Sequence, residues 1–171
     1  MDGRADPVVK LRPVLLTLAL LSGGARAALP APTQTVQQVV TVTVDGKATE
    51  QLRDAATVAP GAVLQGTHVL TLPARRTGAP APNPRYTVAV PLQGRYLAGS
   101  AAADQPGVTV TYALTREGPY SLKPTKTVTV TEGGQKVTRV VPVEPGEYRF
   151  VRFEFGDLQG KVTVRLRYRV Q

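Results

Sequence analysis

Residues 143 to 170 read VEPGEYRFVRFEFGDLQGKVTVRLRYRV, and this stretch decides the fold class of the chain. From Lys161 onward, apolar side chains occupy every second position, and polar or charged side chains occupy the positions between them. A period of two predicts a β-strand with one buried face and one solvated face. The buried face holds Val162, Val164, Leu166, Tyr168 and Val170, and the solvated face holds Lys161, Thr163, Arg165, Arg167 and Arg169.

The segment before this strand, residues 148 to 155, holds all three phenylalanines and one of the six tyrosines of a chain that has no tryptophan. We therefore expect it to pair with residues 161 to 170 as a core-forming hairpin. A four-residue loop, 156 to 159, places Phe153 opposite Val162, so that both side chains reach the core. The same register places Glu154 opposite Lys161 on the outer surface.

The first strand of this expected hairpin has an irregular pattern. Tyr148 and Phe150 share one parity, whereas Val151, Phe153 and Phe155 share the other. The switch indicates either a bulge or a strand that is covered on both faces.

The rest of the chain is rich in valine, threonine, glycine and proline, a composition that favours short strands joined by turns. Asp45-Gly46 predicts a turn after the first strand, and residues 47 to 57 predict a loop. Val128 and Val130 are expected to face inward. With the terminal pair there are eight candidate strands and no long helix, which predicts an all-β antiparallel sandwich or small barrel. The six further strands are expected at 40–44, 63–72, 85–92, 108–114, 125–131 and 137–143.

The N-terminus resembles an export signal. Lys10 and Arg12 precede an apolar run at 14–21, which is too short to span a bilayer and is followed by the small-x-small triplet 25–27. Cleavage is then expected before Ala28. The chain has no cysteine, so an exported form must be stable without disulfides. The expected organisation is a signal peptide at 1–27, a flexible proline-rich tether at 28–37 and a β-sandwich domain at 38–171.

The formal net charge is +9, and it is +7 without residues 1 to 27, which hold four basic and two acidic residues. Outside the cytoplasm such a charge favours acidic glycans, lipid head groups and envelope phosphates, and no nucleic acid is expected as a partner. The single histidine, His68, lies within an expected strand and is interpreted as a packed or surface side chain and not a ligand, since zinc and copper sites need several ligands. No nucleophile elbow or phosphate-binding loop is present in the sequence. We therefore expect no enzyme activity, cofactor or metal.

The strongest candidate contact surface is the solvated face of the last strand. Alternation places successive arginines about 7 Å apart along that face. One interpretation is that these charges protect an edge strand from unwanted pairing. The other is that their guanidinium groups bind carboxylates or phosphates of a partner. The candidate binding residues are Arg165, Arg167 and Arg169, extended by Arg149, Arg152 and Tyr148 from the expected neighbouring strand.

Three segments together resemble the conserved repeat domain of bacterial surface proteins known as domain of unknown function 11. They are the Val58-Ala-Pro-Gly61 turn with the strand after it, the stretch from Tyr86 through Tyr96-Leu97-Ala98-Gly99-Ser100 to Leu114, and residues 147 to 170. Two positions depart from the family pattern: residues 74–78 replace an Asn-Thr-Gly-like turn, and 90–93 replace Asp-x-Leu-Pro. The resemblance implies an immunoglobulin-like sandwich of about seven to eight strands in the cell envelope. It implies no catalytic residues.

These observations lead to two expected functions. The first is a non-catalytic exported protein of the cell envelope, in the periplasm, outer membrane or cell surface, that docks onto a larger outer-membrane or surface-layer protein. The second is a binding module for acidic glycans or lipid head groups, which uses the basic strand face.

Overall fold

The structure is a computed structural model that describes residues 31–74 and 83–171. The expected signal peptide, the first part of the expected tether and most of the 77–84 connector lie outside these residues. The described part contains eleven β-strands and one short 3-10 helix. They are β1 (Thr33–Val44), β2 (Lys47–Asp54), β3 (Val63–Leu72), β4 (Arg85–Ala89), β5 (Gly94–Tyr96), β6 (Ala102–Ala103), β7 (Thr109–Ala113), β8 (Thr125–Glu132), β9 (Gln135–Pro142), η1 (Pro145–Glu147), β10 (Phe150–Glu154) and β11 (Gly160–Val170).

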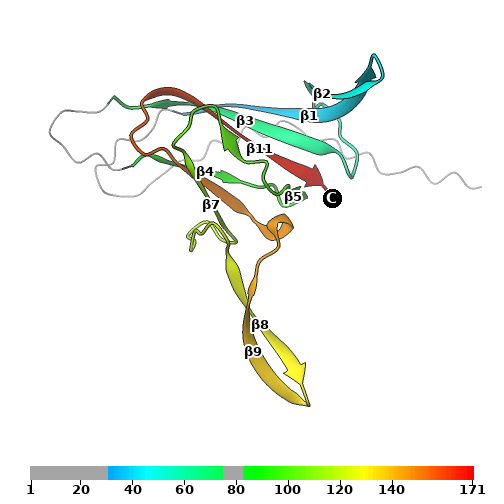
Figure 1. Cartoon of the computed structure of the whole chain (residues 1–171), viewed down its shortest axis with the longest axis vertical. Helices are drawn as coiled ribbons and strands as arrows, with labels where there is room; N and C mark the ends of the chain where they lie inside the picture. Colours follow the sequence, from blue (N-terminus) through cyan, green and yellow to red (C-terminus); the bar gives the residue numbers. More distant parts are fainter. Residues whose placement is uncertain (1–30, 75–82) are drawn as a thin grey trace, which may run out of the picture.

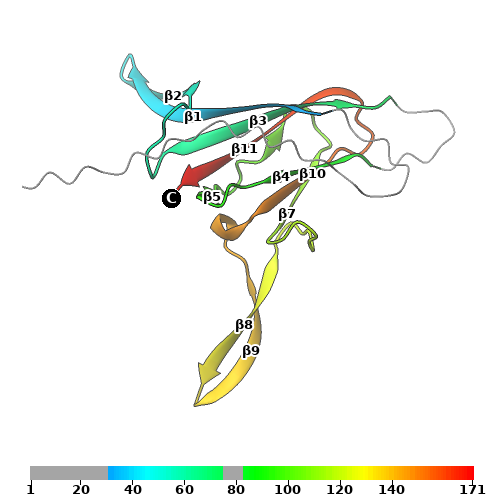
Figure 2. The same cartoon turned by 180° about the vertical axis from the view of Figure 1, so that it is seen from behind.

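The strands form an antiparallel β-sandwich, so the predicted fold class is confirmed (Figure 1). One sheet, here called the wide sheet, has the order β2-β1-β3-β11-β5, with β6 also paired to β11. The second, the narrow sheet, has the order β4-β10-β7. The remaining two strands, β8 and β9, form a separate two-stranded ribbon that points away from both sheets (Figure 2).

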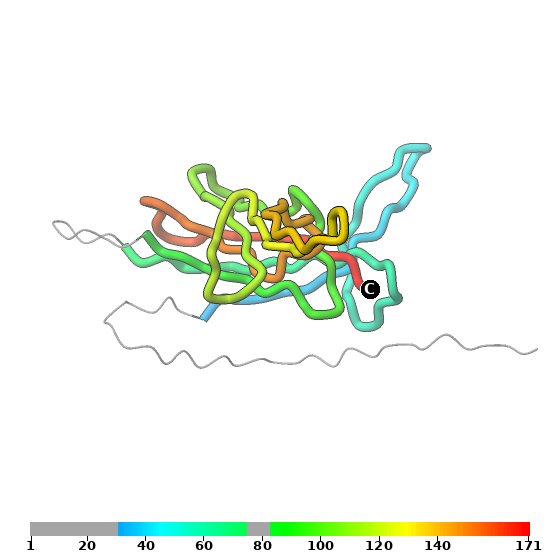
Figure 3. The backbone as a smooth tube through the Cα atoms, turned by 90° about the horizontal axis from the view of Figure 1, so that it is seen from below, coloured from blue at the N-terminus to red at the C-terminus, as the bar shows by residue number. Residues whose placement is uncertain are grey.

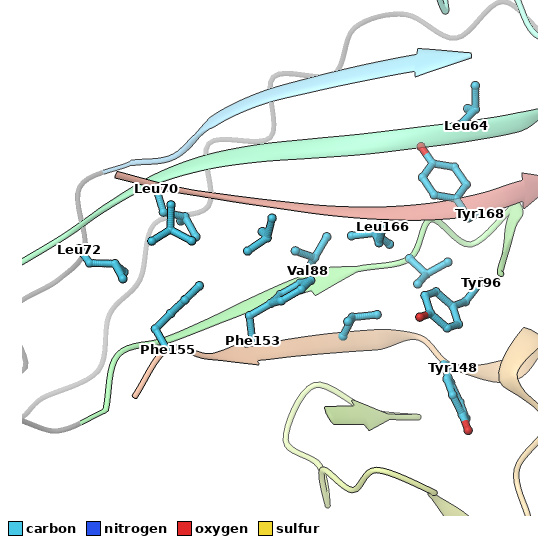
Figure 4. Packing of buried hydrophobic residues seen from close by; sticks show 14 of the residues in the cluster. Leu64, Leu70, Leu72, Val88, Tyr96, Tyr148, Phe153, Phe155, Leu166 and Tyr168 are labelled. Carbon is cyan, nitrogen blue, oxygen red and sulfur yellow. The ribbon is translucent and has the colours of Figure 1, made fainter. Parts of the chain in front are cut away.

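The core lies between the two sheets and is built from the alternate residues that the sequence marks as apolar. Val162, Val164 and Leu166 of β11 are at most 1% exposed. On the other side of the core are Phe153 and Phe155, which are completely buried and project from the narrow sheet and the segment just after it (Figure 4). Strand β3 adds Leu64, Leu70 and Leu72, which share one parity in its sequence.

The predicted terminal hairpin is wrong, because β10 and β11 belong to different sheets. Strand β10 pairs with β4 on one side and β7 on the other, whereas β11 pairs with β3 and, on its other side, with β5 and β6. Phe153 therefore meets the residues of β11 across the core and not across a ladder. Both strands have partners on both sides, so their main-chain N–H and C=O groups are paired in hydrogen bonds.

An engineered disulfide can test this pairing, because the protein has no cysteine of its own. Thr163 and Val69 are partners in the β11–β3 ladder. The carbonyl of Thr163 accepts a hydrogen bond from the Asp104 N–H on the other side of β11, so this is a non-hydrogen-bonded pair with close Cα atoms. We expect Thr163→Cys with Val69→Cys to oxidise readily to a disulfide. A mobility shift under non-reducing conditions measures it.

The control is the pair that the hairpin register would join, Glu154→Cys with Lys161→Cys. In the sandwich these positions lie on the outer faces of opposite sheets, at least about 10 Å apart. They should remain reduced. A disulfide in the control pair and none at Thr163 and Val69 would contradict the strand order.

The wide sheet extends further along the sequence than predicted in two places. Residues Thr33 to Gln37, assigned to the tether, are strand β1 and pair with β3. Residues Lys47 to Asp54, assigned to a loop, are strand β2, which pairs with β1 around the predicted Asp45-Gly46 turn. Asp45 and Gly46 have positive φ angles of 50° and 76°, as a tight hairpin turn requires. Strand β2 is exposed along its whole length, so its sequence carries no alternation that marks it as a strand.

The ribbon of β8 and β9 differs from the prediction in its location. The strands and the Gly133-Gly134 turn are as predicted, with φ angles of 56° and 82° at the two glycines. Val128 and Val130 were expected in the core, but they are only half-buried, on a ribbon that is paired with no other strand of the described chain. Figure 3 views this ribbon from its tip, with the sandwich behind it.

Candidate functional site

The arginine row of the last strand lies on the outer face of the wide sheet, as predicted. Arg165 and Arg169 are exposed and Arg167 is half-buried, whereas the alternate residues of β11 point into the core. Lys161, on the same parity, is also exposed. Arg169 has a basic cross-strand partner, Arg95 of β5, which the sequence could not identify because that pairing depends on the fold.

Arg167 is held by two neighbours and is not free for a ligand. Its Nε donates to Gln65 Oε1 at 3.0 Å, and its Nη1 lies 2.8 Å from Glu50 Oε2. Gln65 lies on β3 and Glu50 on β2, so one side chain connects three strands. In a flat sheet β2 and β11 would be three strand spacings apart, about 14 Å. The ion pair therefore requires β2 to bend toward the outer face, as the curl of the β1–β2 hairpin in Figure 1 shows.

The proposed role of the arginine row as protection for an edge strand is wrong. Strand β11 has ten partner positions along β3 and further partners in β5 and β6. A strand with neighbours on both sides has no exposed ladder to protect. The exposed charges of β11 therefore need another explanation.

The predicted extension of this row by Arg149, Arg152 and Tyr148 is also wrong, because these residues lie on or next to β10 in the other sheet. Arg149 donates from Nη1 to the carbonyl oxygen of Gly94 at 3.0 Å. The Arg152 guanidinium lies 3.3 Å from the centre of the Tyr120 ring, a cation–π contact. Both arginines hold connecting segments in place, and neither lies beside β11.

Tyr148 belongs to the core. Its ring stacks on Tyr112 with a centroid distance of 4.7 Å and lies 5.8 Å from Tyr96. The Tyr96 hydroxyl donates to the Tyr112 hydroxyl at 3.2 Å. Burial, and then the hydrogen bond from Tyr96, raise the pKa of Tyr112 above its usual range. This tyrosine cluster joins the two sheets near η1, and it stabilises the sandwich rather than presenting a surface.

His68 is a packed side chain, one of the two alternatives that the sequence left open. It is 2% exposed, and its Nδ1 lies 2.9 Å from the Tyr86 hydroxyl. Burial lowers the pKa of His68 to about 4, so the ring is neutral at pH 7. It lines a small cavity between the sheets, together with Gln34, Val36, Gly66, Val88, Ala89, Pro91, Leu166 and Tyr168.

The described residues contain no group of three or more histidine, cysteine, aspartate or glutamate side chains placed to hold a metal ion. Within the same residues, no helix is long and apolar enough to cross a membrane. No family model matches the chain, and neither a curated protein nor a solved structure is similar to it.

Proposed function

We propose that this protein is a non-catalytic exported subunit of the cell envelope, an immunoglobulin-like sandwich that docks onto a larger surface assembly through the β8–β9 ribbon. The observation that carries the proposal is the ribbon itself, eight paired positions that form no sheet with the described body. An isolated two-stranded ribbon is only marginally stable in water. Contact with a partner would give it a stable environment.

The ribbon has two different faces and two free edges. One face carries a stripe of four valines, Val128, Val130, Val137 and Val141, flanked by Lys126, Glu132 and Arg139, and the other is mostly threonine. Val137 is 36% exposed, and Val140 on the threonine face is 69% exposed. The outward main-chain groups of β8 and β9 can pair with a strand of another protein, and the valine stripe can bury apolar area against it.

The ribbon can be removed without opening the core, which gives a direct test. Its base is closed by a hydrogen bond from the Val143 N–H to the Pro124 carbonyl, at 2.9 Å. We expect replacement of residues 125–142 by a two-residue Asn-Gly turn to change the free energy of unfolding by less than about 1 kcal/mol. The measurements are urea unfolding for stability and co-purification from crosslinked envelopes for association, which we expect the deletion to abolish.

The matched control exchanges Val128 and Val130 for threonine, which keeps the ribbon but removes half of its apolar stripe. This variant should co-purify less efficiently than the native protein and more efficiently than the deletion. Full recovery of the deletion variant with the assembly would contradict docking through the ribbon.

A second candidate function is the binding of acidic glycans or lipid head groups by the basic face of β11. It is favoured by the interior position of β11, where exposed charges protect no edge. Lys161, Arg165 and Arg169 form no ion pair with any described residue.

A further inference from the structure

We propose that the unpaired cations of β11 bind a linear acidic polysaccharide that lies along the strand. This inference rests on the second candidate function and specifies its ligand. The site, here called the basic strip, consists of Lys161, Arg165 and Arg169, which are four residues apart and share one face. At the rise of an extended strand, successive cations are about 13 Å apart and the strip is about 27 Å long. Only an elongated ligand can contact all three.

Arg167 is the one charged residue that lies between strip residues on this face of β11, and its charge is already neutralised. The spacing of the free cations is therefore set by the fold. Arg167 would halve the interval between Arg165 and Arg169, but its guanidinium is paired with Glu50 and Gln65. At the other interval, Thr163 is uncharged and its N–H donates to Asp104 Oδ1 at 2.9 Å. Along β11 the free positive charges are therefore separated, and Arg95 of β5 adds a second charge beside Arg169. A polymer with anionic groups at intervals can contact this whole row, whereas a single phosphate cannot.

The surface beside the strip is polar and uncharged. The residues of β3 opposite β11 on the outer face carry no charge and no ring: Val63, Gln65, Thr67, Val69 and Thr71. The threonine hydroxyls can hydrogen bond to sugar hydroxyls, and no carboxylate of β3 competes with an anionic ligand. Two acidic groups do contact β11, and both are already engaged: Asp104 Oδ1 accepts from the Thr163 N–H, and Glu50 of β2 is paired with Arg167.

The position of β2 favours a narrow polymer over a membrane. Glu50 reaches Arg167, so β2 bends over the same face and places the Glu50 carboxylate beside the strip. A flat anionic bilayer would meet the bent β1–β2 hairpin before it reached the strip, whereas a narrow polymer can lie along β11 beside the hairpin. The Glu50 carboxylate on this path is already paired with Arg167. Single-stranded nucleic acid is disfavoured because the outer faces of β3 and β11 offer no aromatic side chain for base stacking.

The test measures the affinity of the whole protein for polygalacturonate by affinity electrophoresis and calorimetry, at 50 mM and 300 mM salt. We expect binding at low salt that weakens steeply at high salt. The triple variant Lys161→Ser, Arg165→Ser and Arg169→Ser should bind at least about tenfold more weakly and show a smaller salt dependence. Each single variant should show part of this loss.

A charge-matched control removes three exposed cations from other parts of the described surface: Arg116→Ser, Lys123→Ser and Lys136→Ser. Its affinity should stay within about threefold of the native protein, because its long-range effect is screened. Equal losses in the two triple variants would show that net charge alone drives binding and would overturn the strip. Unchanged thermal unfolding of both variants shows that the fold is intact.

Tests with two further ligands distinguish failure of this inference from failure of the second candidate function on which it rests. Vesicles containing phosphatidylglycerol and single-stranded DNA are tested against the same variants. Strip-dependent binding to vesicles but not to polygalacturonate would overturn the polysaccharide and keep the second candidate function. Preferential binding to DNA, or no binding to any of the three at low salt, would overturn both.

Discussion

Replacing Phe153 with alanine is expected to lower the free energy of unfolding by about 3–5 kcal/mol, the range for removal of a buried aromatic ring. Phe153 is completely buried and lies in β10, the middle strand of the narrow sheet. Its ring packs on residues of the facing wide sheet (Figure 4). The cavity left by alanine would lie between two sheets that are each fixed by their own ladders, so it cannot close by movement of one side chain.

Phe150 provides the control, because it is the same residue type in the same strand and is only half-buried. Phe150→Ala is expected to cost about 1 kcal/mol, the centre of the range for point substitutions, because the ring is only partly removed from solvent. Urea unfolding of both variants, followed by far-UV circular dichroism, gives the two free energies. Similar losses at the two positions would contradict the assignment of Phe153 to the core and Phe150 to the outer side.

The sequence predicts which residues of a half-buried strand face the core, but not which strands are neighbours. The alternation in β3 and β11 identifies the buried sets correctly, because one side of each strand contacts the core and the other contacts water. Phe153 and Val162 are both fully buried, as predicted, yet they lie in different sheets. Both side chains can be buried whether the two strands are hydrogen-bonded neighbours in one sheet or face each other across the core. Periodicity therefore cannot distinguish a hairpin from a connection between sheets.

The parity switch at Phe150 and Val151 has a local explanation. Strand β10 begins at Phe150, and Tyr148 precedes it as the residue that ends η1. The Tyr148 N–H donates to the Pro145 carbonyl, so this residue is positioned by the helical turn and not by the pleat. Both Tyr148 and Val151 are buried, although they are three residues apart.

Strand β2 is exposed on both faces and gives no periodic signal, which explains its prediction as a loop. Strand β2 has no buried residue, and its sequence is mixed and polar. The threonine and valine alternation of β8 correctly predicts a strand, but it cannot show that the valines lie outside the core. The candidate site had a similar limit: the row of arginines on β11 is visible in the sequence, whereas the Glu50 contact that removes Arg167 from it depends on how β2 bends.

The stability of the protein is expected to fall between pH 6.5 and about pH 4 because of His68. Burial lowers the pKa of His68 from 6.5 to about 4 in the folded protein. In this interval the unfolded chain binds a proton at this residue and the folded protein does not, so the free energy of unfolding decreases as the pH decreases. The full contribution is present above pH 6.5 and is lost below about pH 4. A difference of this size in pKa corresponds to about 3 kcal/mol.

Carboxylates titrate in the same interval, so the effect of His68 is obtained from a difference between proteins. His68→Asn retains a side-chain acceptor near Nδ1 for the Tyr86 hydroxyl and cannot be protonated in this range. The native protein should lose about 3 kcal/mol relative to this variant between pH 7 and pH 4. Because burial is the cause of the shift, Tyr86→Phe should keep most of this pH dependence while it lowers stability at every pH. Parallel stability curves for the native protein and His68→Asn would show that the ring is protonated as easily in the folded protein as in the unfolded chain, and that the space around His68 admits water.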